Sequence, residues 1–441
     1  MHGYHGSRRW TGQRRHPRSH PTGMETVKTK AAQRGSALTR LARSDTFSSL
    51  ALPQFRFLLA GTALSQVAGW MEEVSRGWLV LQLTHSPFQL GLFGFIRGFS
   101  QLLVSPAAGV LADRLDRRRL AAITQLVPGL AALAIAALVS ADRIAVWHLY
   151  VAACVGGAAM AVNMPARQVL VYDVVGGEYL TNAIGLNSVT SNLARIVAPS
   201  VGGLIIGAAG IGASFYTQTV FFGLATVATL LLRPIAQAEP VRTPMLRGIR
   251  EGVAYVRGDP TVLRLVLLNL IPNVLIYPYV ALMPVFAEDV LHVGSAGYGV
   301  LLTGVGFGSI PGGLIVASMS ASSWKGRAMG LAALLYMAMV AAFALSTWFA
   351  LSFAILVVAG LGWSMMVTLN QTLLQLHLSD AFRGRVLALY TMAGGLTPFG
   401  SLSMGSAADA FGVQQAVVAF ALAGFALAAV VGLGSERVRR L

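Results

Sequence analysis

Long apolar stretches, separated by short polar or turn-rich breaks, recur along the chain from residue 55 to residue 434. A helix of about 20 apolar residues crosses the hydrocarbon core of a bilayer, so each stretch predicts one transmembrane helix. The eleventh stretch is the weakest, because Gly, Ser and Thr dilute its apolar residues. The pattern predicts an all-α polytopic membrane protein with twelve spans, at 55–83, 87–112, 119–140, 146–168, 183–208, 212–233, 262–287, 296–318, 327–346, 349–373, 385–409 and 413–434.

The longest internal break separates the sixth span from the seventh and divides the spans into two sets of six. The two sets resemble each other weakly, since APSVGGLIIG in the fifth span and LTPFGSLSMG in the eleventh take corresponding places. Two similar six-helix halves with a site between them are typical of transporters. The predicted domains are a disordered basic cytosolic tail at 1–52, bundles at 53–233 and 262–434, a cytosolic linker at 234–261 and a cytosolic C-terminal tail at 435–441.

Composition agrees with a membrane protein, because 55% of the residues are hydrophobic and only 11% are charged, against about 25% in soluble proteins. A soluble enzyme of this composition could not bury its apolar surface. The polar tail lacks the apolar segment of a signal peptide, and disorder explains its four histidines better than metal binding does. No cysteine and histidine spacing indicates a metal site, no cofactor is expected, and the single cysteine, Cys154, is expected to be a packed small residue.

The net charge of +16 reflects where the basic residues lie. With the N-terminus in the cytosol, only Arg143 of the 33 lysines and arginines falls in an external loop, and three fall within spans. All the others, Arg167 among them, fall on the cytosolic side. This bias predicts a multi-pass protein of the plasma (inner) membrane with both termini in the cytosol. It explains the basic composition without a nucleic-acid partner.

A charged turn, GVLADRLDRRRL at residues 109–120, joins the second and third spans. The carboxylate of Asp113, at the end of the second span, is placed to pair with an arginine or to cap a neighbouring helix. Breaking such a contact would let one half of the protein move; the alternative is a basic loop that only fixes topology. The candidate residues of this gating loop are Gly109, Asp113, Arg114, Arg117 and Arg118.

This turn resembles the signature loop of the major facilitator superfamily. With WLVLQLTHSPFQLGL (78–92), NMPARQ (163–168), NAIGLNS (182–188) and RGRVLALY (383–390), it is similar to the enterobactin-exporter-like branch, the transmembrane secretion effectors. The resemblance implies two pseudo-symmetric six-helix bundles and a loop aspartate that stabilises the outward-open state through the eleventh span. Asp116 replaces the family's glycine, a change that a short polar residue tolerates in a left-handed backbone. The matching turn of the second half has Lys325 and Arg327 but no aspartate.

Prolines and glycines mark two spans. In the fifth span, Pro199, Gly202 and Gly203 predict a kinked, closely packed helix. Their segment APSVGG resembles the G-P-x-x-G-G element of superfamily antiporters, although small-residue packing alone would also account for it. In the seventh span, Pro272 and Pro278 are expected to bend the helix.

Charged residues in the first span share one side of the helix. At 100° per residue, Glu72, Glu73 and Arg76 lie on a polar arc with four small or polar residues, namely Thr62, Ser65, Gln66 and Gly69. Such an arc is typical of a helix that lines a cavity, and a carboxylate there is suited to carry protons, Glu73 before Glu72. The alternative is a structural cluster in which Arg76 neutralises the glutamates.

The other deep polar residues are weaker candidates. Arg97, Arg195 and Asn192 could bind an anionic or polyhydroxylated substrate, or the arginines could pair with the glutamates across the bundle. In the second half, the candidates for the cavity wall are Asn269, Asn273, Tyr277, Trp363 and Asn370, although aromatic residues near span ends also anchor helices at the membrane interface.

These patterns favour a monomeric secondary active transporter that exports a small amphipathic molecule, a drug or a siderophore-like metabolite, by alternating access and proton antiport. No P-loop for ATP occurs. An uptake transporter of the same fold and a non-transporting receptor or scaffold stay open as alternatives. A membrane enzyme is disfavoured, because the four histidines outside the tail are scattered.

Overall fold

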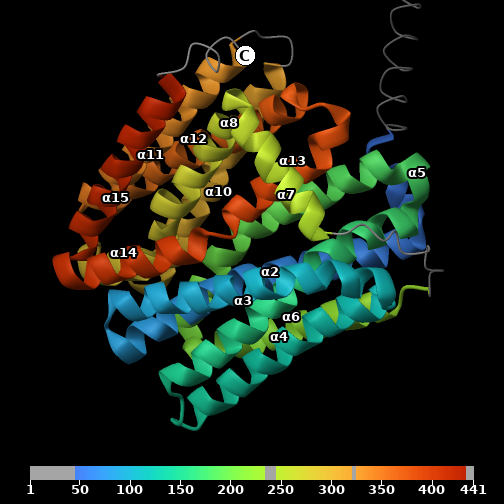
Figure 1. The fold of residues 1–441 in the computed structure, drawn as a ribbon. Coiled ribbons are helices and arrows are strands. Elements are labelled where there is room, and N and C mark those ends of the chain that lie inside the picture. The colour runs from blue at the N-terminus through green and yellow to red at the C-terminus, as the bar shows by residue number, and fades with distance from the viewer. Residues whose placement is uncertain (1–44, 234–244, 320–323, 434–441) are drawn as a thin grey trace, which may run out of the picture. The chain divides into compact units, whose positions relative to one another are not determined.

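The computed structural model describes residues 45–233, 245–319 and 324–433. Helices make up the first half of the compact unit that begins at Ser49 (Figure 1). Prolines start α2 and α3, where a missing N–H costs nothing. The helices of this half are α2 (Pro53–Thr84), α3 (Pro87–Arg114), α4 (Arg117–Ser140), α5 (Val146–Ala209) and α6 (Ile211–Leu230).

The turn between α3 and α4 does not need the left-handed backbone that Asp116 would tolerate. Asp116 has φ −57° and ψ 110°, so its backbone is not left-handed. Its carboxylate accepts hydrogen bonds from the backbone N–H groups of Arg118 (2.9 Å) and Arg119 (3.3 Å). Asp116 therefore caps α4, a role in which aspartate is favoured over glycine.

Two predicted spans are joined in α5, which has 64 residues. A straight helix of that length would measure about 96 Å, roughly three times the thickness of the hydrocarbon core. Gly176 interrupts it with φ 68° and ψ −178°, a conformation open to glycine. Gly176 is the residue of α5 whose backbone angles are not helical, and the kink at Pro199 stays a prediction.

The second half begins with a helix that the apolar pattern did not predict, α7 (Met245–Gly258), inside the predicted linker. The seventh span departs from α geometry at its prolines, as expected, and runs through α8 (Pro260–Ile271), η2 (Pro272–Ile276), η3 (Tyr277–Leu282), α9 (Met283–Val285) and η4 (Phe286–Val290). The remaining elements are α10 (Gly294–Ser318), α11 (Lys325–Leu345), α12 (Phe349–His377), α13 (Asp380–Gly394), α14 (Thr397–Phe411), α15 (Val413–Ala428) and η5 (Ala429–Leu433).

Nine helices within the described residues are long and apolar enough to cross a membrane. The other predicted spans correspond to α2, which carries four charged residues, to the second segment of α5, and to α13 with α14, which a short break divides. The helix arrangement is therefore consistent with twelve spans.

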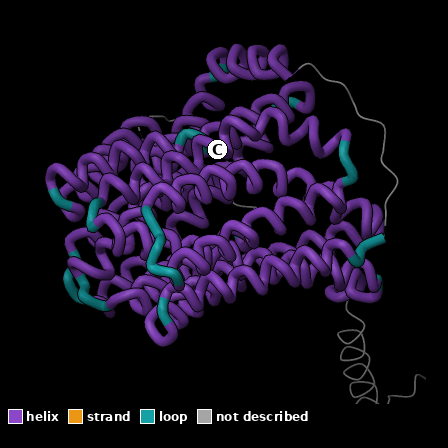
Figure 2. The backbone as a smooth tube through the Cα atoms, turned by 90° about the horizontal axis from the view of Figure 1, so that it is seen from below, coloured by secondary structure: helices purple, strands orange, loops and turns teal. Residues whose placement is uncertain are grey.

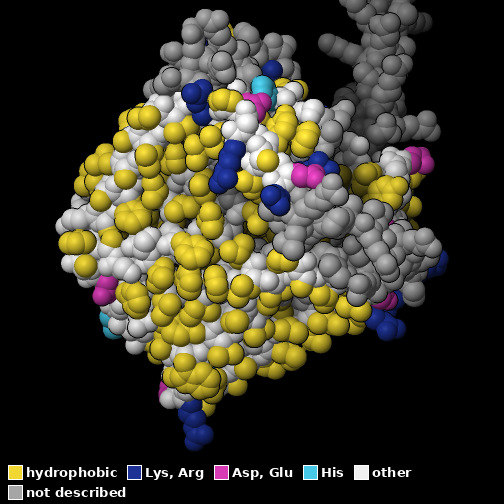
Figure 3. All heavy atoms as spheres, viewed as in Figure 1, with side chains coloured by type: hydrophobic (Ala, Val, Ile, Leu, Met, Phe, Trp, Pro, Cys, Tyr) yellow, Lys and Arg dark blue, Asp and Glu magenta, His cyan; other side chains and the backbone are white. Residues whose placement is uncertain are grey.

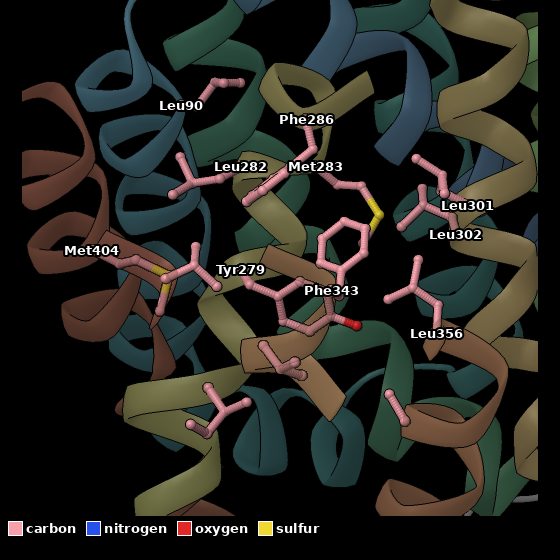
Figure 4. Packing of buried hydrophobic residues seen from close by; sticks show 14 of the residues in the cluster. Leu90, Tyr279, Leu282, Met283, Phe286, Leu301, Leu302, Phe343, Leu356 and Met404 are labelled. Atoms are coloured by element: carbon pink, nitrogen blue, oxygen red, sulfur yellow. The ribbon is translucent and has the colours of Figure 1, made fainter. Parts of the chain in front are cut away.

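Hydrophobic side chains cover much of the visible face in Figure 3, especially its lower and left parts. Many large apolar residues are exposed, for example Leu314 (67%) and Leu376 (71%). Exposed apolar surface of this extent is what a bilayer covers. The interior of the second half is aromatic, with Phe343 between Tyr279 and Phe286 at ring distances of 6.0 Å and 4.8 Å (Figure 4).

The loops lie at the ends of the helices (Figure 2). We call the end that carries residues 85–86, 141–145, 210, 291–293, 346–348 and 412 the closed face, and the other end the opposite face. The two halves touch along α5 with α10 and along α3 with α14. These contacts lie toward the closed face.

Glycines make the first contact possible. A Cβ on Gly203 would lie 3.2 Å from the Cα of Gly299, and one on Gly299 would lie 3.0 Å from the carbonyl carbon of Pro199. The hydroxyl of Thr303 donates to the carbonyl of Ile196 at 2.7 Å across the same contact. The backbones of α5 and α10 therefore touch almost directly.

The contact between α3 and α14 has the same character. A Cβ on Gly91 would lie 2.9 Å from the Cα of Gly405. At the closed face, Ser86 Oγ donates to the carboxylate of Asp409 at 2.8 Å.

Candidate functional site

The predicted polar arc of α2 faces α5 over its first part. Arg167 on α5 donates to Ser65 Oγ at 3.1 Å and also to the hydroxyl of Thr62. Gln66 donates to Ser191 Oγ at 3.0 Å. The guanidinium of Arg167 is half-buried against α2, and its predicted place on the cytosolic side stays a prediction. The motif NMPARQ is the only sequence signal near it, and that motif does not indicate which helix the arginine faces.

Glu72 and Arg76 form a buried ion pair, with side chains 9% and 2% exposed. Arg76 Nη1 also donates to the carbonyl of Ala152 on α5 at 3.3 Å. Gly156 leaves the space that this guanidinium occupies, because a Cβ there would lie 3.1 Å from Nη1. The structure therefore contains the alternative that we considered for Glu72, in which Arg76 of the same helix pairs with it.

Glu73 pairs instead with Arg97, which projects from α3. The two side chains are 28% and 32% exposed, far more than the pair beneath them. Glu73 is thus the accessible carboxylate of the arc, and its partner comes from another helix. A carboxylate that solvent can reach is able to exchange protons.

Tyr277 belongs to η3 of the second half, and η3 contacts α3, the helix that carries Arg97. The charges of Glu73, Arg97 and Arg195 act on its phenol. Trp363 of α12 lies between two tyrosine rings, 5.6 Å from that of Tyr277 and 5.1 Å from that of Tyr336. We call this group the central site: Glu73, Arg97, Arg195, Tyr277, Tyr336 and Trp363.

Arg195 is half-buried on α5. Within the described residues it has no ion pair or hydrogen bond to its guanidinium. Its charge reaches Tyr277, Tyr279 and Tyr336. The sequence did not indicate Tyr336, because it lies in an uninterrupted apolar span without a neighbouring polar residue or motif.

The predicted asparagines lie elsewhere. Asn192 is exposed and donates to the carbonyl of Ser188 in its own helix at 3.0 Å. Asn269 donates to the carbonyl of Tyr390 at 3.1 Å, and Asn370, 1% exposed, to that of Leu265 at 3.0 Å. Asn273 donates to the carbonyl of Asn269 at 2.7 Å. Asn269 and Asn370 therefore join separate segments, whereas Asn192 and Asn273 bond within their own spans. Within the described residues, none of the four forms a hydrogen bond to a residue of the central site.

The gating loop is described in part. The side chains of Asp113 and Arg114 lie outside the described residues, and no atom lies within 4 Å of a Cβ built on Gly109. Arg117 pairs with Asp173 of α5 at 2.8 Å, a partner in its own half. The predicted contact of this loop with the eleventh span stays a prediction.

A titratable pair lies at the opposite face, outside the spans. The carboxylate of Asp259 caps α8 by accepting from the N–H groups of Thr261 (2.8 Å) and Val262 (3.3 Å), and it contacts His377 Nε2 at 3.0 Å. Burial raises the pKa of this carboxyl, but the hydrogen bonds from Thr261, His377 and Val262 outweigh burial and hold the pKa below its ordinary value.

No group of three metal-ligating side chains occurs among the residues described. Comparison with known proteins decides the family. The description "Transmembrane secretion effector" matches residues 44–439, almost the whole chain. The chain belongs to this family of the major facilitator superfamily. It is therefore a multi-pass membrane protein with the transporter fold of two six-helix bundles, as the sequence predicted.

Relatives carry transporter names. The chain is 24% identical to the Staphyloferrin A transporter of Staphylococcus aureus, over 82% of this chain and 91% of that protein. It is 26% identical to the multidrug efflux pump Tap of Mycolicibacterium fortuitum, over 82% and 91%. It is 22% identical to the enterobactin exporter EntS of Shigella boydii, over 77% and 81%.

Solved structures share the fold at lower identity. The nucleoside transporter NupG superposes with a TM-score of 0.71 at 13% identity, covering 86% of this chain and 98% of that one. A bacterial homologue of the human lysosomal transporter Spinster, in an inward-facing and unoccupied conformation, gives 0.71 at 14% identity, covering 88% and 98%.

Proposed function

We propose that this family member exports a small amphipathic molecule, a drug or a siderophore-like metabolite, across the plasma membrane in exchange for protons. The observation that carries the proposal is the accessible Glu73–Arg97 pair at the centre of the fold. The names of the relatives, two of which refer to export or efflux, support this direction. The absence of a P-loop from the sequence favours an ion gradient as the source of energy.

In this proposal the opposite face is cytosolic, and both termini lie on that side. Support comes from the basic residues, since the turn between α3 and α4, the end of α6 and the start of α11 all carry them at that face. The closed face is then external, and the conformation is inward-facing. Gly203 and Gly299 form part of the external contact that must separate for release.

Glu73 is the proposed proton carrier. A proton on Glu73 would cancel its charge, break the pair with Arg97 and free both side chains to move. Glu72 has a different proposed role, because Arg76 neutralises it in a packed environment that protons reach less easily. A buried pair of this kind supports the neighbouring site without taking part in exchange.

The gating loop and the domain division complete the proposal. Asp113, with Gly109, Arg114, Arg117 and Arg118, would stabilise the outward-open state by contact with the eleventh span. The tail 1–52, the bundles 53–233 and 262–434 and the linker 234–261 would act as one monomer, with the bundles rocking about the central site.

The test is efflux from cells loaded with a panel of amphipathic dyes and exposed to an imposed pH gradient. Glu73→Gln should reach the membrane folded and lose the acceleration of efflux by the gradient. Glu178→Gln, a change at an exposed glutamate of α5 outside the site, is the matched control and should behave as wild type. Unchanged pH dependence in Glu73→Gln would remove Glu73 as the carrier, and gradient-driven accumulation instead of efflux would favour the uptake alternative.

A further inference from the structure

We propose that the transported molecule carries a carboxylate or another anionic oxygen group, and that Arg195 binds this group beside Tyr277. The inference rests on the proposed transport function and names the chemical class of its substrate. It starts from the charges at membrane depth in the first half. Ionised Glu72 cancels Arg76, and ionised Glu73 cancels Arg97, which leaves Arg167 and Arg195 without a carboxylate among the described residues. Arg167 donates to the hydroxyls of Thr62 and Ser65, whereas the guanidinium of Arg195 has no hydrogen bond in that part of the chain.

An arginine without a counter-charge is costly inside a membrane protein and usually faces a cavity, a ligand or a carbonyl. Arg195 lies where the halves meet, because the backbone of α5 at this residue and at Ile196 faces Gly306 of α10. A guanidinium in that place offers planar, paired N–H donors, which match the two oxygens of a carboxylate.

The second half supplies hydroxyl donors toward the same place. Tyr277, Tyr279 and Tyr336 all lie within reach of the charge of Arg195. Tyr279 and Tyr336 are each 1% exposed, and no hydrogen bond from any of the three hydroxyls is found within the part of the chain that the structure describes. Among the described tyrosines, only the hydroxyl of Tyr390 is fully enclosed without a partner, so these three hydroxyls open onto unfilled space. One cation and several free O–H donors together complement an anion.

The surroundings suit the rest of an amphipathic molecule. Trp363, between Tyr277 and Tyr336, offers an aromatic surface next to the polar groups. A cation in this place would instead meet the charge of Arg195, which no carboxylate among the described residues neutralises, and like charges repel. Exchange of an outgoing anion for an incoming proton also moves both charges in the direction that an inside-negative potential favours.

The experiment measures the binding of two xanthene dyes of similar size to the full-length protein in a non-ionic detergent, by fluorescence anisotropy. One dye is anionic, carboxyfluorescein, and the other is cationic, rhodamine 123. Wild type should bind carboxyfluorescein at least about ten times more tightly than rhodamine 123. Arg195→Gln should raise the Kd for carboxyfluorescein about 10- to 100-fold, the loss of one charge-assisted hydrogen bond. Arg195→Lys keeps the charge but loses the paired donors, so it should raise the Kd by a smaller factor.

Arg143→Gln, at the closed face, is the control and should leave the Kd unchanged. An unchanged Kd in a folded Arg195→Gln variant, or a wild type that binds rhodamine 123 as tightly as carboxyfluorescein, or binds neither, would overturn the inference. The efflux assay with Glu73→Gln tests the proposed function separately from this binding experiment. Transport of rhodamine 123 alone would therefore leave the proposed function standing while it removes the anionic substrate class.

Discussion

A single methyl group added at Gly299 should force α5 and α10 apart at the closed face. The Cβ of alanine there would overlap the carbonyl of Pro199 and lie 3.1 Å from the Cα of Ser200, and both are backbone atoms that cannot turn aside. Ordinary contact requires about 3.5 Å or more, so α5 and α10 must separate by about 1 Å. Overpacking of this kind costs about 1–3 kcal/mol.

That cost applies only to the state in which α5 and α10 touch. We therefore expect Gly299→Ala to shift the equilibrium about 5- to 150-fold toward the state that is open at the closed face. Gly223→Ala on α6 is the matched control, because no atom of the described residues lies within 4 Å of a Cβ there.

Pulsed electron paramagnetic resonance would measure the shift. Replacing Cys154, the only cysteine, provides a background for labels at His85 and Phe411, which lie in different halves at the closed face. A second label pair at Glu178 and Leu376 reports on the opposite face. Gly299→Ala should lengthen the first distance and shorten the second. Distance distributions identical to those of Gly223→Ala would refute the claim that this glycine contact controls the conformation.

Three further predictions concern other parts of the fold. Arg76→Met should lower the free energy of unfolding by about 3–5 kcal/mol, because it leaves Glu72 charged and buried; a Tm within a degree of wild type would contradict this. Asp113→Asn should slow transport by loosening the outward-open state, and normal turnover would reduce the gating loop to a topology signal. Since hydrogen bonds hold the pKa of Asp259 below its ordinary 3.8, its stabilisation is complete above that value and is lost as the pH falls through the lower folded value. Asp259→Asn, an equally good helix cap, should therefore flatten this acid loss of Tm, and an acid profile identical to wild type would count against the cap.

The sequence predicted the features that depend on local pattern. The span positions follow from apolar stretches, and the polar arc of α2, with Glu73 near its middle, follows from helical geometry. The role of Glu73 as proton carrier stays a prediction. Arg97 was named as a partner for a glutamate. Tyr277 and Trp363 were named for the second half, and the structure puts their rings 5.6 Å apart.

Other features depend on which helices meet, which one chain's pattern does not reveal. Arg167 looked like one more basic residue near a span end, yet it contacts Thr62 and Ser65. Tyr336 gives no polar signal within its apolar span. The predicted asparagines were chosen for polarity alone, and their partners turned out to be neighbouring carbonyls. The amphipathic helix α7 was not predicted, because a search for continuous apolar stretches does not detect a helix with polar residues on one side.

The most direct test of the account is proton flux in proteoliposomes that contain the purified protein and a pH-sensitive dye in the lumen. A panel of small amphipathic compounds would be added on one side in the absence of any imposed gradient. The account predicts that a transported compound drives protons in the opposite direction, and that Glu73→Gln abolishes this flux. Protons that move in the same direction as the compound, or no flux with any compound, would contradict proton-coupled export.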